Sequence, residues 1–289
     1  MATRGGGHAS DTAGERLIAV IRAAIKLLDA GNDVAVAKAA ASIAAVASEC
    51  GASTELLGEA IPKLSDLIVN AGGKGTHVRR NSCAALTAVM GTHESLLRQA
   101  ISSSGCNRLI LSLLDMANHD LDVPTKINAV CTIGQICQVP EGVGEVIRAG
   151  GIHEILSAIS WAGHSGDERL EASIADVICA LATEKRYHLD LAREGAIEKL
   201  AALLLRSSSR EVEVRALMAF GMLLGKDHSD NQARLAGVHG IVSRLVKLTQ
   251  SEDQDIKIIA QTLFRTLASN STLRPGVEAE LRAAAQVSK

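Results

Sequence analysis

Apolar residues recur along this chain with a helical period, and the pattern itself repeats. A ten-residue phrase starts near residues 15, 59, 105, 150, 195 and 237, so successive starts are 44, 46, 45, 45 and 42 residues apart. In the phrase that begins at Gly195, the fifth and ninth residues after the start are Leu200 and Leu204. Residues four positions apart share one face of a helix. The pattern therefore predicts an amphipathic helix at each start.

A second helix is predicted after each phrase. Its apolar residues form a series that we call the register residues, spaced by 43, 47, 45, 42 and 43 positions: Ile43, Leu86, Ile133, Ile178, Phe220 and Leu263. Shorter amphipathic segments precede four of the starts, at 93–102, 143–150, 188–195 and 231–237. The predicted repeat is therefore a short helix, a middle helix and a long helix, in this order.

The repeats are expected to stack, because one such unit is too thin to bury its own apolar face. We predict a repeat domain over residues 15–270, preceded by a tail without fixed structure at 1–14. Residues 271–289 are predicted to form a C-terminal capping helix and tail. Two polar stretches within the domain, 116–124 and 162–169, are predicted to be solvated loops.

These features resemble the armadillo repeat family over about residues 15–270. The resemblance rests on the Gly-Gly-Ile start at Gly150, the Gly-Ala-Ile start at Gly195, Ile-Pro-Lys-Leu at 61–64 and the alanine-rich long helices. It implies an all-α fold, a right-handed α-solenoid (armadillo-type superhelix) of about six three-helix repeats. HEAT repeats, which stack two-helix units, are the alternative. The short third helix and the glycine before the middle helix favour the armadillo type.

Composition agrees with helix packing and narrows the class of partner. Apolar residues make up 47% of the chain but aromatic residues only 1%, so thin layers of Ala, Leu, Ile and Val must fill the core. The 30 basic and 32 acidic residues give a net charge of −2, so bulk attraction of a polyanion is not expected. Nucleic acid is therefore not the predicted partner.

The lack of a secretory or membrane-spanning signal and the pattern of cysteines favour an intracellular protein, cytoplasmic or nuclear. No apolar stretch reaches the 18 or so residues of a membrane-spanning helix, and the N-terminus lacks the apolar core of a secretory signal. Cys83, Cys131, Cys137 and Cys179 lie in apolar helical stretches, and no Cys-x-x-Cys pair occurs. All six cysteines are predicted to be free thiols in a reducing compartment.

Candidate catalytic and metal-binding motifs are weak. The segment 72–76, Gly-Gly-Lys-Gly-Thr, lacks the glycine and the preceding strand of a phosphate loop, which favours a flexible loop. No two histidines lie four residues apart, and the nearest set of metal-ligand types, His119 with Asp120 and Asp122, is predicted to be a solvated turn. The sequence therefore predicts no catalytic residue, no metal site and no cofactor, and a protein that is not an enzyme.

The resemblance implies that the long helices line a concave, partner-binding surface. In nuclear import receptors of the importin-alpha kind, this surface carries a Trp two residues before each register residue and an Asn two residues after it. The Trp positions here hold Ala41, Ala84, Cys131, Asp176, Met218 and Gln261. The Asn positions hold Ala45, Ala88, Gln135, Ala180, Met222 and Arg265. Both ladders are missing, so recognition of a basic nuclear localisation signal is not expected.

The residues that replace the ladders predict a different ligand. One turn earlier the same ridge carries Ala37, Arg80, Ile127, Ala172, Val214 and Lys257, so charge lies mainly near the two ends. Small residues and methionines between them suit a helical or apolar segment. The predicted groove residues are Arg80, Ala84, Ala88, Ile127, Cys131, Gln135, Asp176, Ala180, Val214, Met218, Met222, Lys257, Gln261 and Arg265. The alternative is that these residues pack on neighbouring helices and that partners bind elsewhere.

The sequence thus predicts a non-catalytic scaffold or adaptor, a monomer or a subunit of a hetero-complex, that holds a protein segment in its groove. Two alternatives stay open. The chain could be a structural subunit of a cytoskeletal or organelle assembly that uses its convex face or its ends. It could also be a regulatory, substrate-binding subunit of a separate enzyme.

Overall fold

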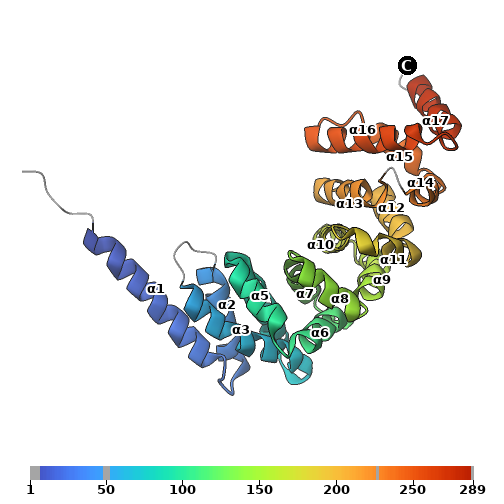
Figure 1. The fold of residues 1–289 in the computed structure, drawn as a ribbon. Helices are drawn as coiled ribbons and strands as arrows, with labels where there is room; N and C mark the ends of the chain where they lie inside the picture. Colours follow the sequence, from blue (N-terminus) through green and yellow to red (C-terminus); the bar gives the residue numbers. More distant parts are fainter. Residues whose placement is uncertain (1–6, 48–52, 226–227, 288–289) are drawn as a thin grey trace, which may run out of the picture. The chain divides into compact units, whose positions relative to one another are not determined.

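The computed structural model describes residues 7–47, 53–225 and 228–287, and all regular structure in these ranges is helical. Seventeen α-helices and two short 3-10 helices follow one another along the chain (Figure 1). They form two compact units, unit 1 (Met1–Ala149) and unit 2 (Gly150–Lys289). This confirms the predicted all-α class.

Each helix is called short, middle or long by its position in the predicted repeat and not by its length. The long helices are α2 (Asp33–Ala47), α4 (Thr76–Thr92), α7 (Val123–Ile136), α10 (Glu168–Leu181), α13 (Arg210–Leu223) and α16 (Gln254–Ser269). The middle helices are α1 (Gly7–Leu27), α3 (Thr54–Val69), α6 (Cys106–His119), α9 (Gly151–Ser165), α12 (Ala196–Arg206) and α15 (Ile241–Leu248). The short helices are α5 (Glu94–Ser102), α8 (Pro140–Arg148), α11 (His188–Arg193) and α14 (Ser229–Ala236). The 3-10 helices η1 (Ala71–Gly73) and η2 (Lys185–Tyr187) and the final helix α17 (Arg274–Val287) complete the set.

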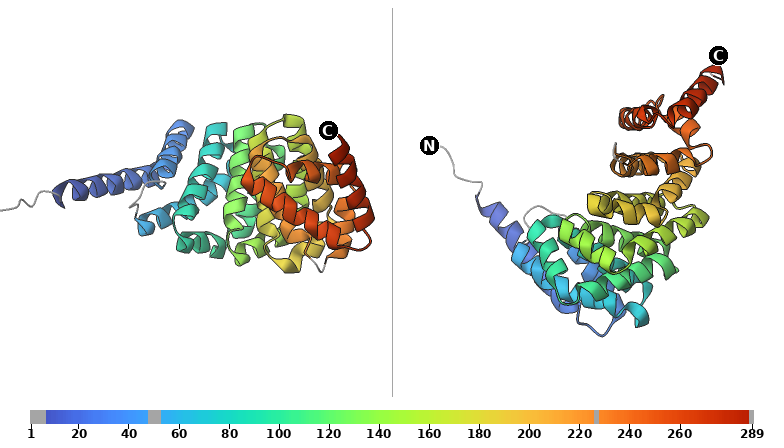
Figure 2. Two further views of the ribbon diagram at one scale, coloured as in Figure 1. Left: turned by 90° about the horizontal axis from the view of Figure 1, so that it is seen from above. Right: turned by 45° about the vertical axis from the view of Figure 1, so that its right-hand side comes forward.

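The repeat seen in the sequence is present in the chain order of these helices. The succession short, middle, long occurs four times, from α5 to α16. Among the described residues, the first two repeats show a middle and a long helix. All six register residues are buried, with exposed fractions of 3% or less. In unit 2 the long helices α10, α13 and α16 lie in successive layers, with the middle and short helices on the other side (Figure 2). The register residues therefore face the core between the helix layers.

Three predicted boundaries differ from the structure. Helix α1 already begins at Gly7, so residues 7–14 are helical and not a tail, because an existing helix is extended at little cost; residues 1–6 lie outside the described part. The predicted loops shrink to 120–122 and 166–167, since α6 continues to His119 and α9 to Ser165. The predicted C-terminal helix is present as α17, and its role as a cap remains a prediction.

Acidic caps explain why three of the long helices start where they do. The first amide groups of a helix have no partner within it, and an Asp or Asn side chain can accept their hydrogen bonds. Asp122 accepts from the amide of Thr125 at 3.0 Å. Asp167 and Asp253 accept from two amides each at the starts of α10 and α16. The aspartates before α7, α10 and α16 are therefore helix caps, whereas α4 and α13 start without a side-chain cap.

Glycines in the left-handed conformation start three of the middle helices. Gly150, Gly195 and Gly240 have φ values of 79°, 85° and 82°, which only glycine adopts at little cost. Their spacing is 45 residues in both intervals. The phrase placed at Gly237 is thus three residues early, because Gly237 instead ends α14 in a right-handed conformation. The left-handed glycines therefore mark the starts of these three middle helices at a more regular interval than the ten-residue phrases do.

Basic side chains tie three of the middle helices, α3, α12 and α15, to the middle helix of the preceding repeat. Lys63 donates to the carbonyl of Ile25 at 3.4 Å, and Lys199 donates to that of Leu156 at 2.8 Å. Arg244 donates to the carbonyls of Leu204 and Ser207, at the end of α12, at 3.3 and 3.0 Å. A cation near the C-terminal end of a helix also compensates the helix dipole. These contacts hold the middle helices of each unit in line.

Candidate functional site

The exposed face of the long helices is the first candidate surface, and in unit 1 it is formed by α2, α4 and α7. Helix α4 packs against both neighbours. The register residues Leu86 and Ile133 point into the core, whereas residues two positions away are partly exposed. All six predicted groove residues of this unit are partly exposed: Arg80, Ala84, Ala88, Ile127, Cys131 and Gln135. The predicted positions are accessible, and their role in binding remains a prediction.

The long helices of unit 2 show the same alternation. Helix α13 packs between α10 and α16. The eight predicted residues of this unit all reach the surface: Asp176, Ala180, Val214, Met218, Met222, Lys257, Gln261 and Arg265. Met218 is a large apolar side chain that is 42% exposed. The column one turn earlier is less uniform than expected, because Ala37 and Ala172 are buried.

Two asparagines that the sequence reasoning missed hold the long helices of unit 1 together. Asn81 of α4 donates to the carbonyl of Ala37 in α2 at 2.9 Å, and Asn128 of α7 donates to that of Arg80 in α4 at 3.0 Å. Both asparagines lie five positions before a register residue. Their amide groups therefore bind the protein's own backbone, unlike the asparagines expected to hold a peptide.

An apolar cavity of about 460 Å³ opens between α2 and α4. Its apolar lining comes from Val34, Ala37, Ala41 and Val78. Val34 is 63% exposed. Polar residues complete the lining: Asp33, Lys38, Gly75, His77 and Asn81. The sequence identified Ala41 as a Trp position and Ala37 as the residue one turn earlier on the same ridge. The cavity depends on small side chains that face each other across two helices, and the sequence alone does not show that pairing.

Charges on the long-helix face of unit 2 are largely paired. Asp176 of α10 lies 3.6 Å from the guanidinium of Arg215 in α13, which also contacts Glu211 at 3.4 Å. Arg210, at the start of α13, bridges to Asp253 at 2.6 Å and to Asp255 at 2.9 Å. Exposed pairs of this kind contribute little to stability. Met218 is an exposed apolar side chain on the same face.

Four of the five cysteines in the described part of the chain are buried and unreactive. Cys83, Cys106, Cys131, Cys137 and Cys179 are free thiols. Burial raises the pKa of Cys83 and of Cys137 to about 12, and the pKa of Cys106 and of Cys179 to about 11. A thiolate is the reactive form, so these four thiols are inert near neutral pH.

Metal and membrane features were sought in the same part of the chain. Among the residues that the structure describes, no group of three or more His, Cys, Asp or Glu side chains could hold a metal ion. None of the described helices is both long and apolar enough to cross a membrane.

The residues His119, Asp120 and Asp122 do not form the solvated turn that the sequence predicts. Asp120 is nearly buried and receives hydrogen bonds from Arg79, with Nε at 2.7 Å and Nη2 at 3.4 Å. Asp122 caps α7, and His119 contacts Asp115 at 3.0 Å. The prediction was wrong because Arg79, 41 residues before Asp120 in the chain, supplies a partner that local sequence cannot reveal.

The Arg79–Asp120 pair should make stability depend on pH. Burial alone would raise the pKa of Asp120, but the hydrogen bonds from Arg79 and the Asp122 amide hold it below its usual value. Because the pKa of the unfolded chain, near 4, is higher, the unfolded state binds the proton first as the pH falls. Stability from this pair is therefore present above about pH 4 and is lost as the pH falls through the folded-state pKa.

We expect Asp120→Asn to lower the free energy of unfolding by about 1–3 kcal/mol at pH 7. At pH 3 the difference between the two proteins should be smaller. Urea titrations followed by circular dichroism at both pH values measure it. An equal loss at pH 7 and pH 3 would show that the carboxylate charge is not what stabilises this contact.

Comparisons with known proteins support the fold. No protein-family model matches the sequence, and no curated protein matches it. Among solved structures, an engineered protein superimposes with a TM-score of 0.73 at 18% identity, covering 86% of this chain and 99% of that one. A designed armadillo repeat protein gives 0.71 at 19% identity, over 86% and 99% of the two chains. A second designed armadillo repeat protein, solved in complex with the peptide (KR)4, gives 0.70 at 18% identity, over 85% and 98%. The helices of this chain thus adopt the armadillo-type repeat fold, as the resemblance in the sequence predicted.

Proposed function

We propose that this protein is a non-catalytic scaffold that binds an apolar or helical segment of a partner protein on the face of its long helices. The observation that carries the proposal is the apolar cavity between α2 and α4, which opens beside the exposed Val34. Apolar clefts with a few polar groups at the edge are the usual form of a binding site. An intracellular location, favoured by the inert thiols, is part of the proposal.

The chemistry of this face favours an apolar ligand over a basic extended peptide. A designed protein of the same fold was solved with the peptide (KR)4. Asn81 and Asn128 of unit 1 donate to the chain's own backbone. No aromatic residue stands at the six positions where a tryptophan would stack on a lysine. Small side chains and Met218 instead offer apolar contact area, and the methionine thioether adapts to irregular ligands.

Selection of peptides tests the proposal directly. The full chain would be panned against a displayed library of random peptides, and the affinities of selected peptides measured by fluorescence polarisation. We expect selected peptides to carry large apolar residues, and Ala41→Glu to weaken them about tenfold or more. The reason is that the ligand would have to desolvate a carboxylate placed in the apolar cavity.

Ser42→Glu is the matched control, because Ser42 is the next residue of α2, is also exposed and does not line the cavity. It should change affinity less than twofold, and both variants should keep the helical circular dichroism spectrum. Equal binding by the two variants would contradict the assignment to this cavity. Met218→Glu with Met222→Glu tests the unit 2 face in the same assay, and loss of binding there would extend the surface to α13.

A further inference from the structure

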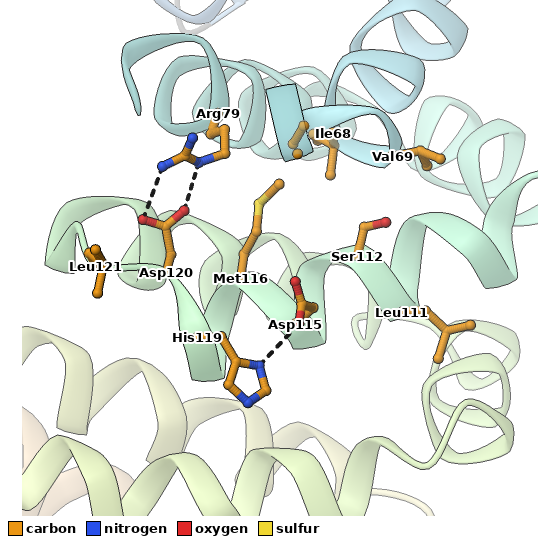
Figure 3. Close-up of a pocket in the computed structure, with 12 residues that line it drawn as sticks. Ile68, Val69, Arg79, Leu111, Ser112, Asp115, Met116, His119, Asp120 and Leu121 are labelled. Atoms are coloured by element: carbon orange, nitrogen blue, oxygen red, sulfur yellow. Dashed lines mark hydrogen bonds and ion pairs between the residues drawn. The ribbon is translucent and has the colours of Figure 1, made fainter. Parts of the chain in front are cut away.

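A second cavity lies in unit 1, between the C-terminal ends of the middle helices α3 and α6 (Figure 3). Its volume is about 530 Å³, and it shares no lining residue with the cavity between α2 and α4. Ile68 from α3 and Met116 from α6 point toward each other (Figure 3), and both are buried, so they form the floor of the cavity. This cavity is large enough for a bulky side chain of another protein.

Two leucines beside this cavity are unusually exposed for their size. Leu121 is 97% exposed and Leu111 is 48% exposed, and both line the cavity. Leu121 lies in the three-residue connection between α6 and α7 and gains almost nothing from the fold. Burying an exposed leucine is favourable, and exposed apolar residues at a cavity mark interaction sites. The two leucines therefore provide apolar contact area for a ligand.

The charge at the mouth of the cavity favours a cation. The Asp115 carboxylate is 75% exposed, and its contact in the structure is with His119. The cationic groups nearby are occupied: Arg79 by Asp120, Lys126 by the carbonyl of Asn118, and Lys74 by Asp33. Helices α3 and α6 also both end here, at Val69 and His119. A helix C-terminal end carries partial negative charge, which adds to that of Asp115.

We propose that this cavity is a docking site for a protein segment in which a lysine or arginine adjoins a large apolar residue. The apolar side chain of the partner lies in the cavity above the buried Met116 and packs against the exposed Leu121. The basic side chain lies at the mouth and pairs with Asp115. This site is independent of the long-helix face, so each assignment can fail without the other.

Two capped dipeptides, acetyl-Leu-Arg-amide and acetyl-Leu-Glu-amide, are suitable probes. The full chain would carry isotope-labelled methionine and leucine methyl groups, and the dipeptides would be titrated in NMR experiments. We expect the Arg probe to shift the Met116 and Leu121 signals in a saturable way, with a dissociation constant on the order of 1 mM for a ligand of this size. The Glu probe should bind about two- to fivefold more weakly, as expected for one exposed ion pair.

Three variants decide the outcome. Asp115→Asn should remove the preference for the Arg probe, and Leu121→Ala should weaken both probes. Because both side chains are exposed, neither variant should change the melting temperature by more than a degree or two. Asp230→Asn makes the same change of charge on an exposed residue of unit 2 and should have no effect. No saturable shift around the cavity, or a preference for arginine that survives Asp115→Asn, would overturn the proposal.

Discussion

Replacing Gly142 by alanine should lower the free energy of unfolding by about 3 kcal/mol. Gly142 lies in the short helix α8, which packs directly on the end of α7. A Cβ atom there would come within 1.8 Å of the carbonyl oxygen of Ile136 and 3.1 Å of Cδ1 of Ile101. The first of these is a backbone atom, so it cannot move without displacing one of the two helices. Urea unfolding followed by circular dichroism measures the loss.

Gly91→Ala is the matched control, because Gly91 is also a helical glycine of unit 1. Its added Cβ would meet only the side chain of Gln135, at an ordinary distance of 3.8 Å. Alanine is the better helix former, so this variant should be neutral or stabilised by up to about 1 kcal/mol. If the two variants lost similar stability, loss of glycine itself, and not close contact between α7 and α8, would be the cause.

The fold could be predicted from the sequence because two separate series of residues show the same repeat. The phrase and the register residues both recur at intervals near 45 residues, and every register residue is buried in the structure. Helix ends could be predicted less well. Asp122 and Asp167 look like loop residues in the sequence, but their carboxylates cap α7 and α10. A polar residue between two apolar runs can equally be a loop or a cap, and only the backbone decides.

Four charged residues show what the periodicity missed. Arg79, Lys126, Glu171 and Glu213 each lie seven positions before a register residue. Seven residues are nearly two full turns, so such a residue is on the same, core-facing side of its helix. Lys126 is indeed fully buried, and Glu171 and Glu213 are nearly so. A charged residue at this position of the repeat could therefore have indicated a buried charged side chain that needs a polar partner.

The partners of these charges could not be found in the same way. Glu171 and Glu213 each pair with an arginine of the following repeat, Arg206 and Arg244. Those arginines lie 35 and 31 residues further along the chain. The same holds for the candidate sites. The exposure of the predicted groove positions could be predicted from the geometry of a single helix. Both cavities depend on contacts between repeats, which the sequence does not show.

Phe220→Ala should have the largest effect of the substitutions considered, a loss of about 3–5 kcal/mol. Phe220 is the aromatic member of the register series and is fully buried in α13. Helix α13 packs against α12 of its own repeat and against α10 and α16 of the neighbouring repeats, so the buried ring lies in a helix with packing partners on several sides. Removing the ring leaves an apolar cavity. The surrounding helices are closely packed, so they can move only slightly to fill it.

Phe264→Ala separates this effect from the loss of any phenylalanine. Phe264 follows the register residue Leu263 in α16 of the same unit and is only partly buried. It therefore gives up less apolar contact, and its loss should be less than half that of Phe220→Ala. The two variants would be compared by urea unfolding at equal protein concentration. Comparable losses would mean that position in the register does not determine which side chains carry the core, and that the repeat in the sequence reflects helix formation more than packing between repeats.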